Sequence, residues 1–309
     1  MAKKRTNIKG RKQTTKNNAW KGIIVVVVMA FLLFQVFQVV AHTSNSADST
    51  STKQEQHAEI VEDTESLNDN ENYATSSTID TDIEYVIVSD SIPNEVVKYT
   101  GFTVYFNCET HIPNCTVYEL TSLEAAGDFP RDDNFHQDEN LEGCPSLDDY
   151  KYSGYDRGHM VPAGDMKWSQ SAMNDCFSLA NMVPQKNALN SGAWNKLEQK
   201  VRNWVVRDEA LIVITGPIVT ESDKNITIGE TGVVVPSSLY KIVLAHKATP
   251  IRAIAIVYPN MKPTGGLEQH ITTIDEVEKA TGLDFFSALP DDIEDEIEAV
   301  SDLNQWEYR

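Results

Sequence analysis

The chain has 309 residues, of which 41% are hydrophobic, and this share is ordinary for a globular protein. Its 26 basic and 46 acidic residues give a formal net charge of -20 at pH 7. This excess of acid argues against tight binding of a polyanion by the surface as a whole, because phosphate binding depends largely on basic side chains. The length allows one large domain or two small ones.

The N-terminal region combines a basic tail with an apolar segment. Residues 1–22 are basic and polar, and residues 23–41 (IIVVVVMAFLLFQVFQVVA) are apolar apart from Gln35 and Gln38. About twenty such residues can span a bilayer as a helix, and the positive charge before them predicts a cytoplasmic N-terminus. A cleaved signal peptide, followed by secretion, is the alternative. We therefore expect a membrane anchor at this segment and an extracytoplasmic protein, periplasmic or on the cell surface.

The next segment, residues 42–82, is rich in Ser, Thr, Asn and acidic residues and has hardly an apolar side chain. Such a composition cannot bury enough surface to offset the entropy of ordering the chain. We predict a disordered linker here, followed by one folded domain over residues 83–309.

Within this domain, β-branched and alternating apolar residues predict several strands. They are expected at 100–107, 115–121, 177–183, 210–216, 232–236, 239–246 and 251–258. Apolar residues recur at helical spacing over 192–207, and further helices are expected at 273–281 and 290–299. Strands on both sides of a helix indicate a mixed α+β domain.

Four cysteines lie in the predicted domain, which fits an oxidising compartment. A Cys108–Cys115 disulfide across a hairpin is plausible, and Cys144–Cys176 would then follow. Free buried thiols are the main alternative. A zinc site is less favoured, because the chain has no C-x-x-C spacing.

The stretch YDRGHMVPAGDM carries the most informative motif, Asp156-Arg157-Gly158-His159. It places a carboxylate, a guanidinium and an imidazole around a glycine that we expect to permit a tight turn. The later stretch NALNSGAWNKLEQKVRNW adds Asn190, Glu198 and Arg202. A base, a neutral oxygen ligand, a carboxylate and two arginines are what metal-assisted cleavage of a phosphodiester requires.

Each of these residues also has a plain structural explanation. A lone histidine is more often structural than catalytic, and Asn190 could simply cap a helix. Glu198 and Arg202 could form a surface i,i+4 pair worth about 0.2–0.5 kcal/mol. Their occurrence together is what favours a site, and residues 156–207 hold seven basic residues against four acids, unlike the acidic remainder of the predicted domain.

These two stretches, with FSLANMVPQ, ITGPIV, VVVPSSLYKIVL and TGLDFFSALPD, resemble the DNA/RNA non-specific endonucleases, the ββα-metal nucleases with a DRGH motif. The resemblance runs from about Gly101 to Leu289. It implies the ββα-metal (His-Me finger) fold, with a central mostly antiparallel sheet flanked by helices.

The resemblance also implies a role for each matched residue. His159 would be the general base, and Arg157 and Arg202 would face the phosphate. Asn190 would be the direct protein ligand of one Mg²⁺ ion, which Mn²⁺ could replace, and Glu198 would hold the ion through water. Asp156 and Asn181 match supporting positions of the family.

The resulting prediction is a Mg²⁺-dependent endonuclease that cleaves DNA and RNA to 5′-phosphate and 3′-hydroxyl ends, tethered to the membrane through residues 23–41. A homodimer is left open. The alternative function is a catalytically silent module of the same fold that binds nucleic acid or another surface. The acidic remainder of the chain predicts weak, salt-sensitive binding of nucleic acid.

Overall fold

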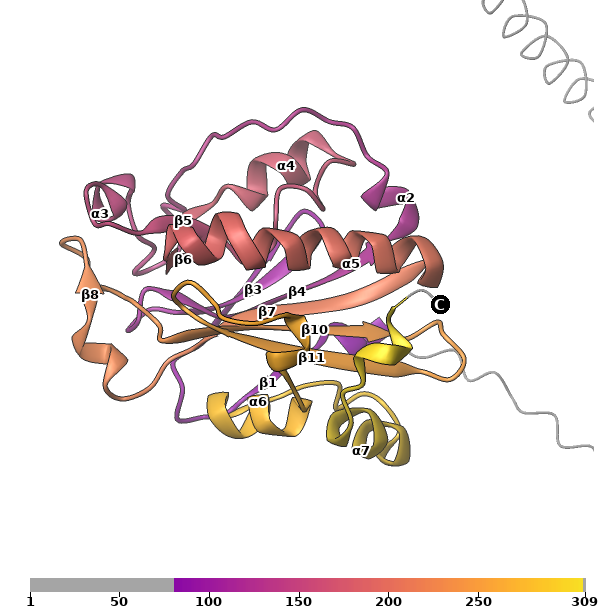
Figure 1. The fold of residues 1–309 in the computed structure, drawn as a ribbon. Helices are drawn as coiled ribbons and strands as arrows, with labels where there is room; N and C mark the ends of the chain where they lie inside the picture. Colours follow the sequence, from indigo (N-terminus) through magenta and orange to yellow (C-terminus); the bar gives the residue numbers. More distant parts are fainter. Residues whose placement is uncertain (1–80, 308–309) are drawn as a thin grey trace, which may run out of the picture. The chain divides into compact units, whose positions relative to one another are not determined.

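The computed structural model describes residues 81–307 and builds them around a seven-stranded antiparallel sheet (Figure 1). The strands follow the order β12-β11-β10-β7-β4-β3-β2. Their bounds are β2 Glu95–Tyr99, β3 Phe102–Asn107, β4 Ile112–Thr121, β7 Ala210–Ile218, β10 Ser238–Ala245, β11 Arg252–Pro259 and β12 Ile271–Thr272. The basic tail, the apolar segment and all but the last two residues of the expected linker lie outside the described residues.

Helices and three short strand pairs complete the fold. The helices are α2 Ser122–Ala125, α3 Leu147–Tyr150, α4 Gln170–Cys176, α5 Asn195–Asp208, α6 Ile274–Thr281 and α7 Asp291–Ala299, with the π-helix η3 Leu189–Trp194 directly before α5. The pairs are β1 Ile87–Val88 with β13 Leu283–Asp284, β5 Asp156–His159 with β6 Met182–Gln185, and β8 Thr227–Ile228 with β9 Val233–Val234. Short 3₁₀ turns are η1 Thr81–Glu84, η2 Leu179–Asn181, η4 Asp223–Asn225, η5 Leu267–Gln269 and η6 Leu303–Gln305.

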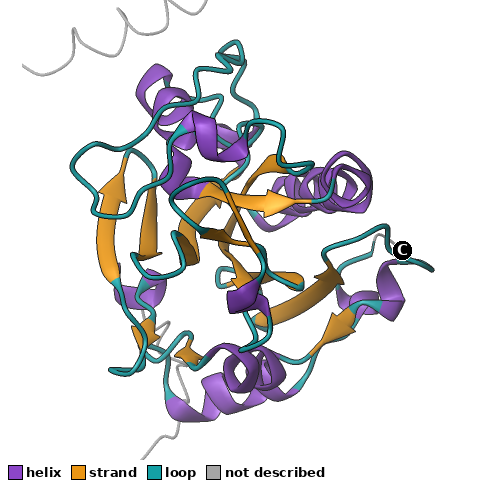
Figure 2. Cartoon of the chain, turned by 90° about the vertical axis from the view of Figure 1, so that its left-hand side faces the viewer, coloured by secondary structure: helices purple, strands orange, loops and turns teal. Residues whose placement is uncertain are grey.

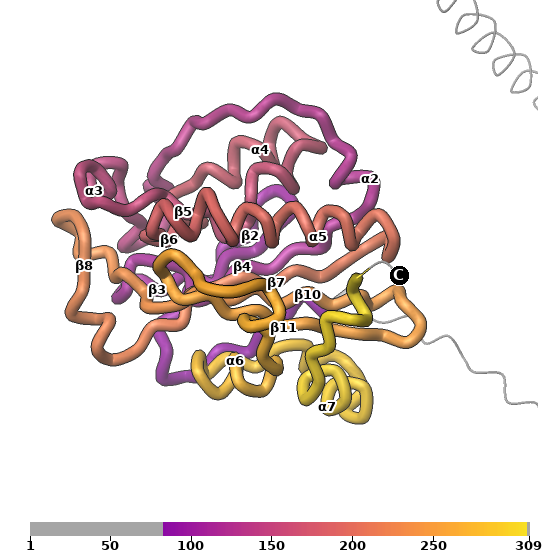
Figure 3. Tube along the Cα trace, in the orientation of Figure 1, coloured from indigo at the N-terminus to yellow at the C-terminus, as the bar shows by residue number. Residues whose placement is uncertain are grey.

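Strand β7 shows why both faces of the sheet are covered. Leu211 and Val213 belong to the core beneath α4 and α5, whereas Ile212 and Ile214 belong to the core beneath α6 and α7. Successive side chains of a strand point to opposite faces, so a continuous apolar run fits a strand buried on both sides. Figures 2 and 3 show these helices on the two sides of the sheet. The predicted α+β class with a flanked antiparallel sheet is confirmed.

The predicted helices form close to their expected bounds. Helix α5 buries Leu197, Val201 and Trp204 against the sheet, as their spacing predicts. Helix α6 begins after Thr273, whose side chain accepts a hydrogen bond from the backbone of Glu276, and it ends at Gly282. Gly282 has φ 72°, a left-handed conformation that glycine adopts without strain.

Two local predictions differ from the structure. Residues 177–183 were expected to form one strand, but the turn η2 occupies Leu179–Asn181, and strand β6 begins only at Met182. The Ser178 side chain accepts a hydrogen bond from the backbone of Ala180 and so stabilises the turn. Strand β2 was not predicted. Its residues are mostly exposed, so the sequence lacks a buried alternating pattern there.

The expected disulfides are not formed, and all four cysteines are free thiols. The strand register gives the reason for the first pair, because Tyr105 and not Cys108 lies opposite Cys115. Cys144 and Cys176 are both buried without a bond between them, and the Cys176 thiol donates to the backbone oxygen of Met173. The alternative of free, mostly buried thiols is therefore the one that the structure shows.

Candidate active site

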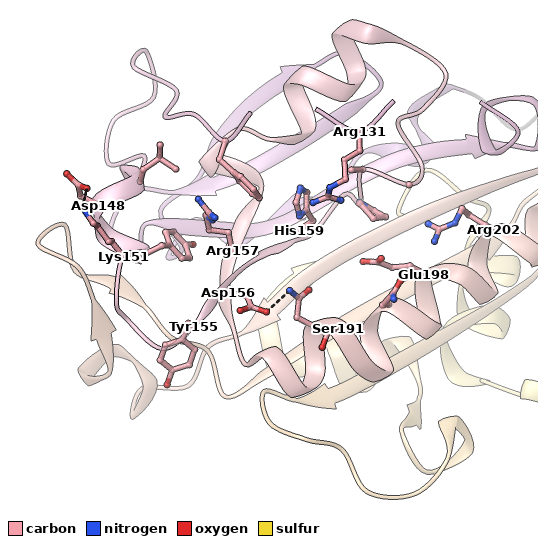
Figure 4. A pocket seen from close by; sticks show the side chains of 18 residues that line it. Arg131, Asp148, Lys151, Tyr155, Asp156, Arg157, His159, Ser191, Glu198 and Arg202 are labelled. Atoms are coloured by element: carbon pink, nitrogen blue, oxygen red, sulfur yellow. Dashed lines mark hydrogen bonds and ion pairs between the residues drawn. The ribbon is translucent and has the colours of Figure 1, made fainter. Parts of the chain in front are cut away.

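A cavity of about 820 Å³ gathers most of the predicted site residues, at one end of α5 beside the β5–β6 pair (Figure 4). Its walls include Asp156, Arg157, His159, Asn190, Glu198 and Arg202, together with Arg131, Phe135, Asp148, Lys151 and Ser191. Of the predicted catalytic, metal and supporting residues, only Asn181 does not line this cavity. The cavity has the size of typical ligand sites.

The β5–β6 pair presents the motif residues to this cavity. His159 lies opposite Met182, and Gly158 lies opposite Val183. Gly158 does not make the tight turn that we expected. It lies within a strand, and a side-chain carbon at this position would collide with the side chain of Gln185. The motif needs glycine because the side chain of Gln185 fills the space that a side-chain carbon at this position would take.

Asn181 holds in place the backbone segment that follows His159. Its side chain accepts a hydrogen bond from the backbone of Val161 at 2.9 Å and donates to the carbonyl groups of Val161 and Cys176 at 3.0 and 2.8 Å. Asn181 is completely buried, so these bonds use its polar atoms inside the core. The residue supports the site without reaching the cavity.

Asp156 fixes the orientation of Asn190. The Asp156 carboxylate accepts hydrogen bonds from the Nδ2 atoms of Asn187 and Asn190, each at 2.9 Å. Because the amide nitrogen of Asn190 is held in this way, its Oδ1 atom stays available as an acceptor, and Asn190 lines the cavity. Asn190 lies on the π-helix η3, a distortion that is frequent at functional sites.

Glu198 points into the same cavity from the first turn of α5. No hydrogen bond from another residue in the range 81–307 reaches its carboxylate. Burial raises the pKa of Glu198 to about 7, and the nearby positive charges of Lys241 and Arg202 oppose this rise. A carboxylate that is partly desolvated and lacks a protein donor is suited to hold a cation or its water.

Lys241 is a charged residue in the core behind this carboxylate. It lies on β10, is 1% exposed, and donates from Nζ to Oγ1 of Thr215 at 2.6 Å. Burial lowers its pKa to about 8, while Glu198 and Asp165 act in the opposite direction. The lysine therefore favours the charged form of Glu198 from the side away from solvent.

Arg202 is held by a buried acid. Its Nη1 atom donates to Oδ1 of Asp165 at 2.5 Å, and the other oxygen of Asp165 accepts from the Tyr118 hydroxyl at 2.6 Å. Asp165 is 1% exposed. Gly164 permits this arrangement, because a side-chain carbon there would lie 2.7 Å from Nη1 of Arg202. The guanidinium is thus fixed at the cavity wall with other N–H groups left for a ligand.

Aromatic rings surround the motif's other two side chains. The Arg157 guanidinium lies 4.0 Å from the centre of the Phe135 ring, and the His159 ring meets Phe177 edge-to-face at 5.0 Å. Arg131 also lines the cavity. Its guanidinium lies 4.9 Å from the centre of the Phe177 ring. Sequence reasoning missed Arg131, because it lies in an irregular segment outside both motifs.

His159 is neutral at ordinary pH in this environment. Burial lowers its pKa to about 3, and the charges of Arg131 and Arg157 add to the shift. A neutral imidazole can accept a proton, whereas an imidazolium cannot. Its Nε2 atom is buried and has no hydrogen-bond partner among residues 81–307, so Nδ1 is the ring nitrogen left for a water molecule.

Comparison with known proteins agrees with this geometry. The family described as DNA/RNA non-specific endonuclease matches residues 79–292. The chain belongs to this family. It is a family of metal-dependent nucleases, and the matched region contains every residue of the site.

Named relatives support the same assignment. The chain is 34% identical to the mitochondrial nuclease EXOG of Mus musculus, over 63% of this chain and 58% of the relative. It is 36% identical to the mitochondrial endonuclease G of Bos taurus, over 62% and 73%. A solved complex of EndoG with EndoGI, described in terms of EndoG inhibition, is similar with a TM-score of 0.59 and 27% identity, over 64% of this chain and 87% of that chain. The chain thus spans less than two thirds of the EXOG relative.

The expected cellular placement is wrong. We predicted a membrane-anchored or secreted, extracytoplasmic protein, but the relatives are mitochondrial nucleases. Residues 23–41, the proposed transmembrane segment, lie outside the described residues. Among residues 81–307, no helix has the length and apolar character needed to cross a bilayer.

Proposed function

We propose that this chain hydrolyses phosphodiester bonds of DNA and RNA, as an endonuclease that uses a divalent cation. The convergence of His159, Asn190, Glu198 and Arg202 on one cavity carries the proposal. We assign the nuclease domain to residues 83–309. The products expected are 5′-phosphate and 3′-hydroxyl ends, and the guanidinium groups of the cavity contact backbone phosphates, so base sequence has little influence.

Each side chain has a separate role in the proposed reaction. His159 takes a proton from the attacking water at Nδ1, since its ring is neutral at working pH. Arg202, fixed by Asp165, donates to the phosphate oxygens and stabilises the charge that develops on them. Arg157 adds a second positive charge beside the cavity and disfavours the charged form of the His159 imidazole.

Asn190 and Glu198 fit a Mg²⁺ ion, with Mn²⁺ as a substitute. Mg²⁺ retains several waters and is bound through few protein oxygens, which suits one amide oxygen and one carboxylate. Asp156 would keep the Asn190 oxygen turned toward the ion. When bound, the ion supplies polarisation of the phosphate and stabilisation of the leaving oxygen.

Digestion of supercoiled plasmid and of RNA by the purified full chain tests the proposal. We expect cleavage of both substrates with Mg²⁺, and loss of cleavage when EDTA removes the ion. The rate should fall with added salt, because the contacts to phosphate come from the basic side chains of the site region. Binding without cleavage at saturating Mg²⁺ or Mn²⁺ would instead identify a catalytically silent module.

At limiting Mg²⁺, the pH dependence of the cleavage rate should follow the ionisation of the Glu198 carboxyl. Its pKa is raised to about 7, so the carboxyl is protonated below that pH and cannot hold a hydrated cation. Activity is therefore expected to rise as the pH increases through about 7, while His159 remains neutral across this range. Rates measured against pH at low and saturating Mg²⁺ check this. At higher Mg²⁺ concentration, the pH below which activity falls should be lower. If that pH does not change with Mg²⁺ concentration, the assignment is contradicted.

A further inference from the structure

A second group of carboxylates lies on the face of the sheet opposite α5, where α6 and α7 pack side by side (Figures 1 and 3). Asp275 and Glu278 come from α6, and Glu298 comes from α7. Each offers one oxygen atom, and the three oxygens lie within 4.8 Å of one another. None of these residues lines the nuclease cavity.

Glu298 is the member that distinguishes this group from an ordinary acidic surface. It is only 8% exposed, and its Oε1 atom is buried without a hydrogen-bond partner among the described residues. A buried carboxylate oxygen without a donor is costly unless something positive pairs with it. Oxygens of the other two acids lie within 4.8 Å of one of its carboxylate oxygens and would repel it when ionised.

The surrounding charges are also negative. Asp284 and Glu294 act on both Glu278 and Glu298, and burial together with these neighbours raises the pKa of Glu278 to about 7 and that of Glu298 to about 8. No ion pair among residues 81–307 involves Asp275, Glu278 or Glu298. Lys279, the basic residue of α6, is turned to solvent beside Glu276. Within the part of the chain that the structure describes, the cluster therefore has no protein cation paired with it.

We propose that Asp275, Glu278 and Glu298 form a calcium site that fastens α6 to α7. Carboxylate oxygens are the ligands that Ca²⁺ prefers. Ligands on opposite sides of a Ca²⁺ ion, at about 2.3–2.6 Å each, lie up to about 5 Å apart, whereas those of Mg²⁺ at about 2.0–2.1 Å lie only about 4 Å apart. The three oxygens lie within 4.8 Å of one another, which is inside the span that one Ca²⁺ ion can bridge.

The site would be structural and distinct from the nuclease centre. Glu278 already accepts a hydrogen bond from the backbone of Phe285 at 2.7 Å, which leaves its second oxygen for the ion. Binding would neutralise the repulsion between the two helices and join α7 to the core that α6 covers. Because protons and Ca²⁺ would compete for the same oxygens, binding should release protons at neutral pH.

Thermal unfolding of the full chain tests this proposal, with Mg²⁺ present throughout to fill the nuclease centre. Calcium at about 100-fold excess over its Kd should raise the Tm by on the order of 5 °C or more. The variant Glu298→Gln should lose this rise. Without calcium it should unfold at about the same temperature as the wild type, because the raised pKa leaves Glu298 mostly neutral at pH 7 and glutamine matches it in size.

The matched control is Glu296→Gln, an exposed residue on the same helix, which should keep the calcium response. Isothermal titration calorimetry in two buffers of different ionisation enthalpy measures the proton release directly. The proposal is overturned if calcium leaves the wild-type Tm unchanged, which would mean that the acids simply share protons. It is equally overturned if Glu298→Gln responds to calcium as the wild type does.

Discussion

Replacing His159 with alanine should lower the rate of plasmid cleavage by about 10²–10⁴, the usual contribution of a positioned general base. The structure supports a base at this position because burial and two arginines keep the imidazole neutral, with a pKa of about 3. The loss should be in kcat, since the ring takes a proton in the reaction and contributes little to substrate binding. Initial rates of supercoiled plasmid loss at saturating Mg²⁺ give the measurement.

The control for this prediction is His270→Ala. His270 lies outside the cavity and contacts Tyr258, so its removal should leave cleavage near the wild-type rate. The His159 ring also packs against Phe135 and Phe177, and for that reason the Tm of each variant must be compared. A folded His159→Ala protein that cuts plasmid as fast as the wild type would rule out the proposed base.

The sequence predicted those parts of the site that lie within its two motifs. Asn190, Glu198 and Arg202 are close in the chain, and helical spacing alone places the last two on one side of α5. The pairing of β5 with β6 then brings His159 to the same cavity. The roles could be assigned because the resemblance covered both motifs together.

The supporting residues could not be found in this way, since only tertiary contact connects them to the motifs. Lys241 comes from β10 and resembles an ordinary strand residue in the sequence, yet it is buried behind Glu198. Asp165 was within a quoted motif, but its link to Tyr118 on β4 requires the folded sheet. Asn260 is likewise connected to the site only by tertiary contact. Its side chain accepts a hydrogen bond from the backbone N–H of Lys186, directly after β6, and donates one to the carbonyl of Pro184.

Local sequence patterns also gave wrong predictions, for example where side chains form hydrogen bonds with the backbone in place of strand pairing. Residues 177–183 are apolar enough for a strand, but the serine and asparagine within them bond to the backbone and form a turn. Cysteine spacing suggested a hairpin disulfide, but the hairpin closes at the pair Asn107 and Ile112, so Cys108 lies in the turn while Cys115 faces Tyr105. Spacing in sequence does not determine which residues of a hairpin lie in its turn.

Replacing Arg202 with alanine should lower kcat by about 10²–10³, as expected when one preorganised donor to a developing charge is removed. The pair with Asp165 holds the guanidinium in place before substrate arrives, so no energy is spent on orienting it during the reaction. Arg202→Lys should give an intermediate rate, because it keeps the charge but loses the planar fork that matches two phosphate oxygens. Plasmid cleavage at several substrate concentrations separates kcat from KM.

Stability must be separated from catalysis in this experiment. Loss of Arg202 leaves the Asp165 carboxylate buried and unpaired except for the Tyr118 hydroxyl, and breaking such a pair costs about 3–5 kcal/mol of folding free energy. The double variant Arg202→Ala with Asp165→Asn removes that buried charge and should recover much of the stability. It should not recover the rate, because the phosphate donor is still missing.

Lys196→Ala is the matched control on the same helix, since this exposed lysine lies outside the cavity and its loss should change kcat little. If the double variant regained wild-type kcat, Arg202 would serve only to neutralise Asp165. If instead kcat stays low while the Tm recovers, the arginine acts on the substrate, and Asp165 is the residue that positions it.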